Sequence, residues 1–310
     1  IVAACKPALE HRCRDVSLFV QRILNHLPVD MLSAAAEEPS HSFPSSARDA
    51  SEGILHRFDI RTLGGFEVRR ENGARINDAE WTGIRQQLLL KAIVVHGCRE
   101  IPKDILMDAL WPESKYDAAL KRFKVTLHRL RRILEPDMDQ RYGASCIILK
   151  DNRISLDMRR CRVDVNDFLA ACNLVRQLAG DDDDQRRLSA CRRAIDIYRG
   201  EFLPEELYLG WAEMKRAALK DQYLAVLVEM VEILERSGDL AQAVRYCEAV
   251  IQADPLAEQA AQRLMRLLLR QGRSSAALQV YRNLTQALAS ELDTGPDSST
   301  IRIYGEILNR

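Results

Sequence analysis

The residues best suited to chemistry lie in segment 115–134, KYDAALKRFKVTLHRLRRIL, which holds seven Lys and Arg side chains and one acid, Asp117. Helical periodicity of 100° per residue places most of these cations on one face, with the small apolar Val125 among them. Guanidinium and ammonium groups donate to phosphates and guanine edges, and an apolar side chain fits against a thymine methyl group. The segment therefore predicts a helix that reads the DNA major groove. Its outward residues are Lys121, Arg122, Val125, His128, Arg129 and Arg132, with Lys124 and Arg131 at the edges of the face.

The other side of the same segment is an apolar stripe that must pack on neighbouring helices. Two helices are predicted upstream, from Gly83 to Gly97 and across 103–110. A solvated basic face on an ordinary bundle helix would carry the same charges. DNA is favoured because a hairpin predicted over 146–157 follows the helix and carries Lys150 and Arg153, where a wing reaches a phosphate or the minor groove. The stripe consists of Leu120, Phe123, Leu127, Leu130 and Leu134.

Ahead of these helices, residues 57–77 alternate apolar and polar side chains and contain two turn signals, Gly64-Gly65 and Asn72-Gly73. This pattern predicts a small antiparallel meander of three strands. Three strands, three helices and a hairpin are the element order of a winged helix preceded by a small sheet. Residues 57–157 also carry 19 basic and 15 acidic side chains in a chain of zero net charge, so the positive excess is local.

The remainder, 158–310, is predicted to be all-α. Gly238 and Gly272 are 34 residues apart, the period of tetratricopeptide repeats, in which stacked helix pairs bury a continuous core. The acidic run 181–184 is interpreted as the capped start of a helix rather than a metal site, because consecutive acids point in different directions. The expected fold is thus mostly α with a small β component: a winged helix-turn-helix domain and then a tetratricopeptide-like helical domain.

Three stretches together resemble the winged helix of SARP-type (antibiotic-regulatory-protein) transcriptional activators: LGGFEV (63–68), RQQLLLKAIVVHGCREIPKDILMDALWP (85–112) and FKVTLHRLRRIL (123–134). Phe123 stands where that family usually has Leu. The entry Val163-Asp164 with Phe168, and the closing text 277–308, resemble the bacterial transcriptional activator domain that accompanies this winged helix, although the turn Glu291–Pro296 is two residues longer than the family's.

The resemblance implies a sequence-specific DNA-binding transcriptional activator of domains 57–157 and 158–310, whose partners are double-stranded DNA with promoter direct repeats, a second protomer and RNA polymerase. In related winged-helix activators the loop 111–117 faces polymerase, and a simple connector is the alternative. The polymerase-contact candidates are Glu113, Ser114, Lys115 and Tyr116.

The first 56 residues are predicted to contain the helical end of an upstream domain (1–33) and a linker (34–56) rich in Ser, Ala, Pro and acid. We interpret the chain as a piece of a longer protein with an upstream sensory or NTPase domain. Eight irregularly spaced cysteines predict reduced thiols and a cytoplasmic, nucleoid-associated protein.

No cofactor, metal or enzymatic activity is expected, because no nucleotide-binding motif, metal-ligand spacing or nucleophile–base pairing occurs in the sequence. A protein-interaction scaffold, in which the repeats carry the function and DNA binding is absent, stays open as the alternative.

Overall fold

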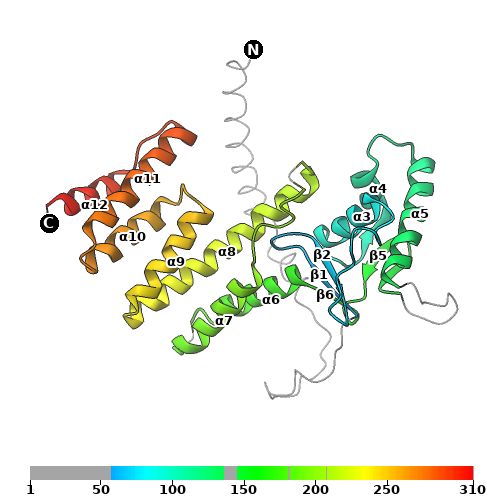
Figure 1. The fold of residues 1–310 in the computed structure, drawn as a ribbon, viewed down its shortest axis with the longest axis horizontal. Helices are drawn as coiled ribbons and strands as arrows, with labels where there is room; N and C mark the ends of the chain where they lie inside the picture. The colour runs from blue at the N-terminus through cyan, green and yellow to red at the C-terminus, as the bar shows by residue number, and fades with distance from the viewer. Residues whose placement is uncertain (1–56, 136–144, 181, 207, 310) are drawn as a thin grey trace, which may run out of the picture. The chain divides into compact units, whose positions relative to one another are not determined.

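The computed structural model describes residues 57–135, 145–180, 182–206 and 208–309. The helix and linker predicted over 1–56 lie outside these ranges. Within them the chain is mostly helical with a small β component, as predicted, and the described residues belong to one compact unit (Figure 1).

The first sheet has the strand order β2-β1-β6, with β1 (Phe58–Arg61) in the centre. Strand β2 (Glu67–Arg70) pairs with β1 antiparallel, and β6 (Cys161–Val163) pairs with β1 parallel. Ile60 in β1 and Val68 in β2 point into the core, which accounts for the alternating pattern of the sequence.

The meander predicted over 57–77 is therefore only partly correct. After the Asn72-Gly73 turn the chain returns beside β2 just long enough for one isolated bridge, between Arg69 and Arg75. It then turns away, because the Asn77 side chain accepts a hydrogen bond from the Glu80 N–H group. The third strand comes instead from 161–163, about 100 residues later in the chain.

Three helices follow the sheet at the predicted places: α3 (Ile84–Val95), α4 (Lys103–Leu110) and α5 (Tyr116–Leu134). The second sheet, of order β3-β5-β4, is formed by β3 (Ile101–Pro102), β4 (Ile147–Lys150) and β5 (Arg153–Leu156). Strands β4 and β5 are the predicted hairpin. Asp151 and Asn152 between them have φ of 48° and 62°, as the two central residues of a type I′ turn require.

The rest of the chain is a succession of helices, each packed on its neighbours. The predicted break at Gly200 separates α7 from the long α8, and Gly238 ends α8 in the left-handed conformation. Asp183 caps α7, since its carboxylate accepts from the N–H groups of Gln185 and Arg186, as the interpretation of the acidic run requires. The helices are α6 (Asp164–Gln177), α7 (Asp184–Ile197), α8 (Gly210–Ser237), α9 (Leu240–Ala253), α10 (Glu258–Arg270), α11 (Ser274–Leu292) and α12 (Ser298–Leu308).

The segment between α7 and α8 packs on the turn that joins β1 to β2. The Gly64 N–H donates to the Glu201 carbonyl at 2.9 Å, and the Leu203 N–H donates to the Thr62 carbonyl at 2.9 Å. Gly64 has φ of 86°, and a Cβ atom there would stand 3.0 Å from the Arg199 carbonyl oxygen, so only glycine allows this approach.

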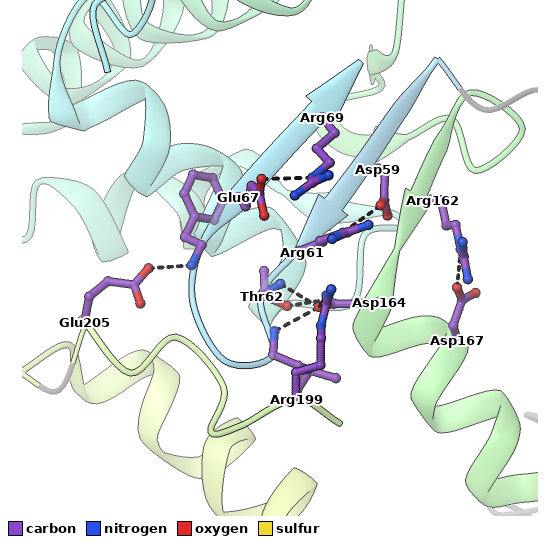
Figure 2. Close-up of polar contacts among 12 residues, drawn as sticks. Asp59, Arg61, Thr62, Glu67, Arg69, Arg162, Asp164, Asp167, Arg199 and Glu205 are labelled. Atoms are coloured by element: carbon purple, nitrogen blue, oxygen red, sulfur yellow. Dashed lines mark hydrogen bonds and ion pairs between the residues drawn. The ribbon is translucent and has the colours of Figure 1, made fainter. Parts of the chain in front are cut away.

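Side chains reinforce this junction (Figure 2). The Asp164 carboxylate, at the start of α6, accepts from the Thr62 and Leu63 N–H groups and from the Thr62 hydroxyl group. Arg199 reaches the same carboxylate at 3.4 Å, and Glu205 accepts from the Phe66 N–H at 2.9 Å. The winged helix and the helical array are thereby joined by buried polar contacts.

Candidate nucleic-acid interface

Helix α5 turns its cationic face outward, as the sequence predicts. The apolar stripe lies on the inner side, where Leu120 is partly buried and the other four residues are fully buried: Phe123, Leu127, Leu130 and Leu134. This burial fixes the rotation of the helix, because the apolar stripe has one way to face the core. The outward residues that the structure exposes are Lys121, Arg122, Lys124, Val125, His128, Arg129 and Arg132.

Val125 is the apolar centre of that face and is 50% exposed. Lys121, Arg122 and Arg129 flank it as helical neighbours, three or four residues away. Val125 is thus an exposed apolar side chain flanked by three cations.

Arg131 differs from its neighbours, because its guanidinium is half-buried and faces the hairpin. Its Nε and Nη2 atoms donate to the Ile147 carbonyl oxygen at 3.2 and 2.8 Å. Burial lowers the pKa of this arginine, an effect that nearby Glu135 opposes. Glu135 itself accepts from the Cys146 N–H at 3.1 Å. Arg131 and Glu135 thus fix the start of the hairpin against the end of α5.

The hairpin presents Lys150 and Arg153 to solvent, one at each side of its turn. Arg153 also donates to the Glu100 carbonyl oxygen at 2.9 Å. Lys103, which was not predicted from the sequence, adds a cation at the turn, since its Nζ atom donates to the Asn152 side chain at 2.9 Å. No local pattern marks it, since the two residues are 49 positions apart.

The loop 111–117 is held at its first residue and in its middle. Trp111 is buried, and Arg122 of α5 donates to the Ser114 hydroxyl at 2.8 Å. Glu113, Lys115 and Tyr116 are exposed. The loop therefore has a fixed position beside the cationic face, and its residues Glu113, Lys115 and Tyr116 offer an acid, a base and an aromatic ring to a partner.

Two shallow hollows adjoin α5, and Thr82 and Arg129 line both. The first has a volume of about 590 Å³ and is also lined by Arg70, Glu80, Arg132 and Ile133. The second, of about 520 Å³, lies between α5 and the start of α3. Apart from the two shared residues its lining is Gly83, Ile84, Arg85, Gln86, Trp111, Lys121, Arg122, Val125 and Thr126. No role for the residues that precede or begin α3 was predicted from the sequence.

Among the described residues no group of three or more His, Cys, Asp and Glu side chains is placed to hold a metal ion. In the same part of the chain, no helix is long and apolar enough to cross a membrane.

Parts of the chain are similar to known proteins. Residues 163–308 match the bacterial transcriptional activator domain. The regulatory protein AfsR of Streptomyces coelicolor is 31% identical over 224 residues, which are 72% of this chain and 22% of AfsR. The transcriptional regulator RedD of the same organism is 26% identical over 224 residues, 71% of this chain and 63% of RedD. These similarities support the resemblance to SARP-type transcriptional activators that the sequence indicates.

A solved structure extends the similarity to three dimensions. Mycobacterium tuberculosis EmbR, in complex with a low-affinity phosphopeptide, gives a TM-score of 0.64 at 21% identity and covers 82% of this chain and 65% of the EmbR chain. The two proteins share the fold, which confirms the predicted fold class, mostly α with a small β component. The chain spans about a fifth of the length of AfsR, so it corresponds to one part of that regulator.

Proposed function

We propose that this SARP-type chain is a sequence-specific DNA-binding transcriptional activator whose α5 helix enters the major groove. The observation that carries the proposal is the division of α5 into a buried apolar side and an exposed face of Lys, Arg and His around Val125. A second support is the hairpin, held against the end of α5 by Arg131. Together they form a helix and a wing with cations on the side that DNA would approach.

Within that proposal the exposed residues have different roles. The residues at and around the centre of the exposed face would read base edges. They are Lys121, Arg122, Val125, His128, Arg129 and Arg132. Lys124, Lys150 and Arg153 would contact the phosphate backbone. Arg131 would act mainly by positioning the hairpin, because its donors already bond to the Ile147 carbonyl oxygen.

Partners follow from the same surface and from the relatives. Loop 111–117 is the proposed contact for RNA polymerase, through Glu113, Ser114, Lys115 and Tyr116. We also propose that two protomers bind side by side on promoter direct repeats. A further proposed partner is an upstream sensory or NTPase domain in the parent protein. The helical domain 158–310 would then hold the winged helix and provide a surface for these contacts.

A selection experiment tests the DNA-binding proposal. The chain is incubated with a random DNA duplex library at two salt concentrations, and bound sequences are identified and measured by fluorescence anisotropy. A short direct-repeat motif should be enriched, with a log–log salt dependence of about 0.9 per neutralised phosphate.

Charge reversal at Arg129 and Arg132 separates DNA binding from a scaffold function. Arg129→Glu with Arg132→Glu should abolish enrichment, and a matched pair of reversals on the far helix α10, Arg266→Glu with Arg270→Glu, should not. Unchanged DNA affinity in the α5 double variant would refute the assigned readout, and the absence of any DNA binding by the wild type would favour the scaffold.

A further inference from the structure

The start of α3 is an open helix N-terminus beside the cationic face of α5. Gly83 occupies the N-cap position, no side chain caps the helix, and no acidic residue lies in its first turn. By contrast, α9 and α12 begin at aspartates whose carboxylates accept first-turn N–H groups. The Gln86 N–H group donates to the Gly83 carbonyl oxygen at 3.4 Å. The N–H groups of Ile84 and Arg85, the first two of the helix, have no acceptor within it and remain available to an anion.

Gln86 supplies a second and independent observation. Its side chain is 3% exposed, and its Oε1 atom is buried without a hydrogen-bond partner. That oxygen lies at the helix start, 3.3 Å from the position that a Cβ atom on Gly83 would occupy. A buried amide oxygen without a donor destabilises the fold. If the terminal amide of Gln86 turns by 180°, its NH₂ group takes the place of the oxygen and then needs an acceptor.

The hollow in front of this helix start is lined by cations and by no acidic residue. Arg85 is held there by a hydrogen bond of 2.8 Å from its Nη1 atom to the Leu110 carbonyl oxygen. Lys121, Arg122 and Arg129 line the hollow from α5. An anion that entered would therefore meet helix N–H groups on one side and positive side chains on the other.

From this arrangement we infer that the N-terminus of α3, together with the Gln86 amide, binds one phosphodiester group of the DNA backbone at the edge of the groove that α5 reads. The inference rests on the proposed function. The phosphate oxygens accept from the first-turn N–H groups and from the Gln86 NH₂ group, which relieves the unpaired amide. A DNA phosphate is favoured over a free anion because the hollow shares Lys121, Arg122, Val125 and Arg129 with the face that meets the bases.

Two variants of the full chain test the site. Ile84 is 64% exposed at the first helical position, so Ile84→Glu places a carboxylate where the phosphate would lie. An acid at this position favours the helix dipole, and the variant should fold at least as stably as the wild type. Gln86→Leu removes the amide, deletes the unpaired oxygen and keeps a similar volume. Thus both changes should preserve or raise stability while they weaken DNA binding.

Binding is measured by fluorescence anisotropy on a labelled DNA duplex over a salt series. We expect Ile84→Glu to weaken binding about tenfold and to reduce the log–log salt slope by about 0.9, the value for one phosphate. Gln86→Leu should weaken binding with little change in slope, since no charge is altered. Ile84→Gln controls for the lost apolar side chain, and Ser298→Glu adds the same charge at the first position of α12; both should bind as the wild type does.

Wild-type affinity in both Ile84→Glu and Gln86→Leu would overturn the phosphate site and leave the proposed function intact. An equal loss in Ile84→Gln and Ile84→Glu would also overturn it, because the charge would then play no part. If the wild-type chain binds no duplex at all, the proposed function itself fails.

Discussion

Asp164 and Thr62 are 102 residues apart in the chain and share two hydrogen bonds. The Asp164 Oδ1 atom accepts from the Thr62 hydroxyl group at 2.8 Å, and Oδ2 accepts from the Thr62 N–H group at 2.8 Å. Both residues are buried. The first residue of α6 is thereby bonded to the end of the sheet that precedes the winged helix (Figure 2). Because the donors are buried, separating the helical array from the sheet would leave them without an acceptor.

Asp164→Ala should lower the free energy of unfolding by about 3 kcal/mol, because it leaves two N–H groups and a hydroxyl group buried without an acceptor. Urea denaturation measures the change. Asp167→Ala is the control, since Asp167 lies on the same helix and pairs only with the exposed Arg162. The control should lose less than about 1 kcal/mol. Similar losses in the two variants would show that the buried hydrogen bonds do not stabilise the junction.

Lys91 provides a second connection between the two parts. It is 3% exposed, and its Nζ atom lies 2.6 Å from Glu206, 3.3 Å from Glu205 and 4.6 Å from the centre of the Phe66 ring. Lys91→Met should cost about 2 kcal/mol of stability, because it leaves the part-buried Glu206 without its cation. Adding Glu206→Gln should recover part of the loss, with a coupling energy of about 1 kcal/mol in a double-mutant cycle. If the stability changes of the two substitutions were strictly additive, the ion pair would not contribute to stability.

The cap of α12 predicts a pH dependence. The hydrogen bond from the Thr300 N–H group, 2.8 Å long, lowers the pKa of Asp297 below its ordinary value of 3.8. A lowered carboxyl pKa stabilises the fold above the ordinary value, and the contribution is lost as the pH falls through the lowered one. Asp297→Ala should thus be less stable than the wild type near pH 7, and the difference should shrink below about pH 4. Ser298→Ala should show no such pH trend. A difference independent of pH would show that the charge of Asp297 is not involved.

Periodicity and turn chemistry were enough to predict the helix 116–134 and the hairpin around Asp151 and Asn152. Each depends on residues close together in the chain: the stripe from Phe123 to Leu134, and two residues that tolerate positive φ. The third strand of the first sheet could not be predicted in the same way. The segment 161–163 is short, and only its pairing with β1, far away in the chain, makes it a strand.

The same distinction applies to the site. The exposed cations of α5 follow from helical geometry, whereas the role of Arg131 depends on a carbonyl oxygen 16 residues away. Gln86 resembles any polar residue in an amphipathic helix, and only packing shows that its amide oxygen is buried and unpaired. Contacts between distant segments therefore determine which polar residues are exposed on the candidate interface and which hold its elements in place.

Arg131 and Lys124 provide the sharpest test of that difference, since both are cations at the edges of one helical face. Lys124 is exposed, so Lys124→Gln should weaken DNA binding and reduce the log–log salt slope by about 0.9. The guanidinium of Arg131 bonds to the Ile147 carbonyl oxygen, so Arg131→Gln should weaken binding through a displaced hairpin and leave most of the slope unchanged.

Anisotropy titrations over a salt series distinguish the two variants, and urea denaturation provides the second measurement. Arg131→Gln should also lower the free energy of unfolding by about 1–2 kcal/mol, because the Ile147 carbonyl oxygen loses its donor. Lys124→Gln should change stability by less than about 0.5 kcal/mol. A full loss of slope with unchanged stability in Arg131→Gln would show instead that this arginine contacts a phosphate directly.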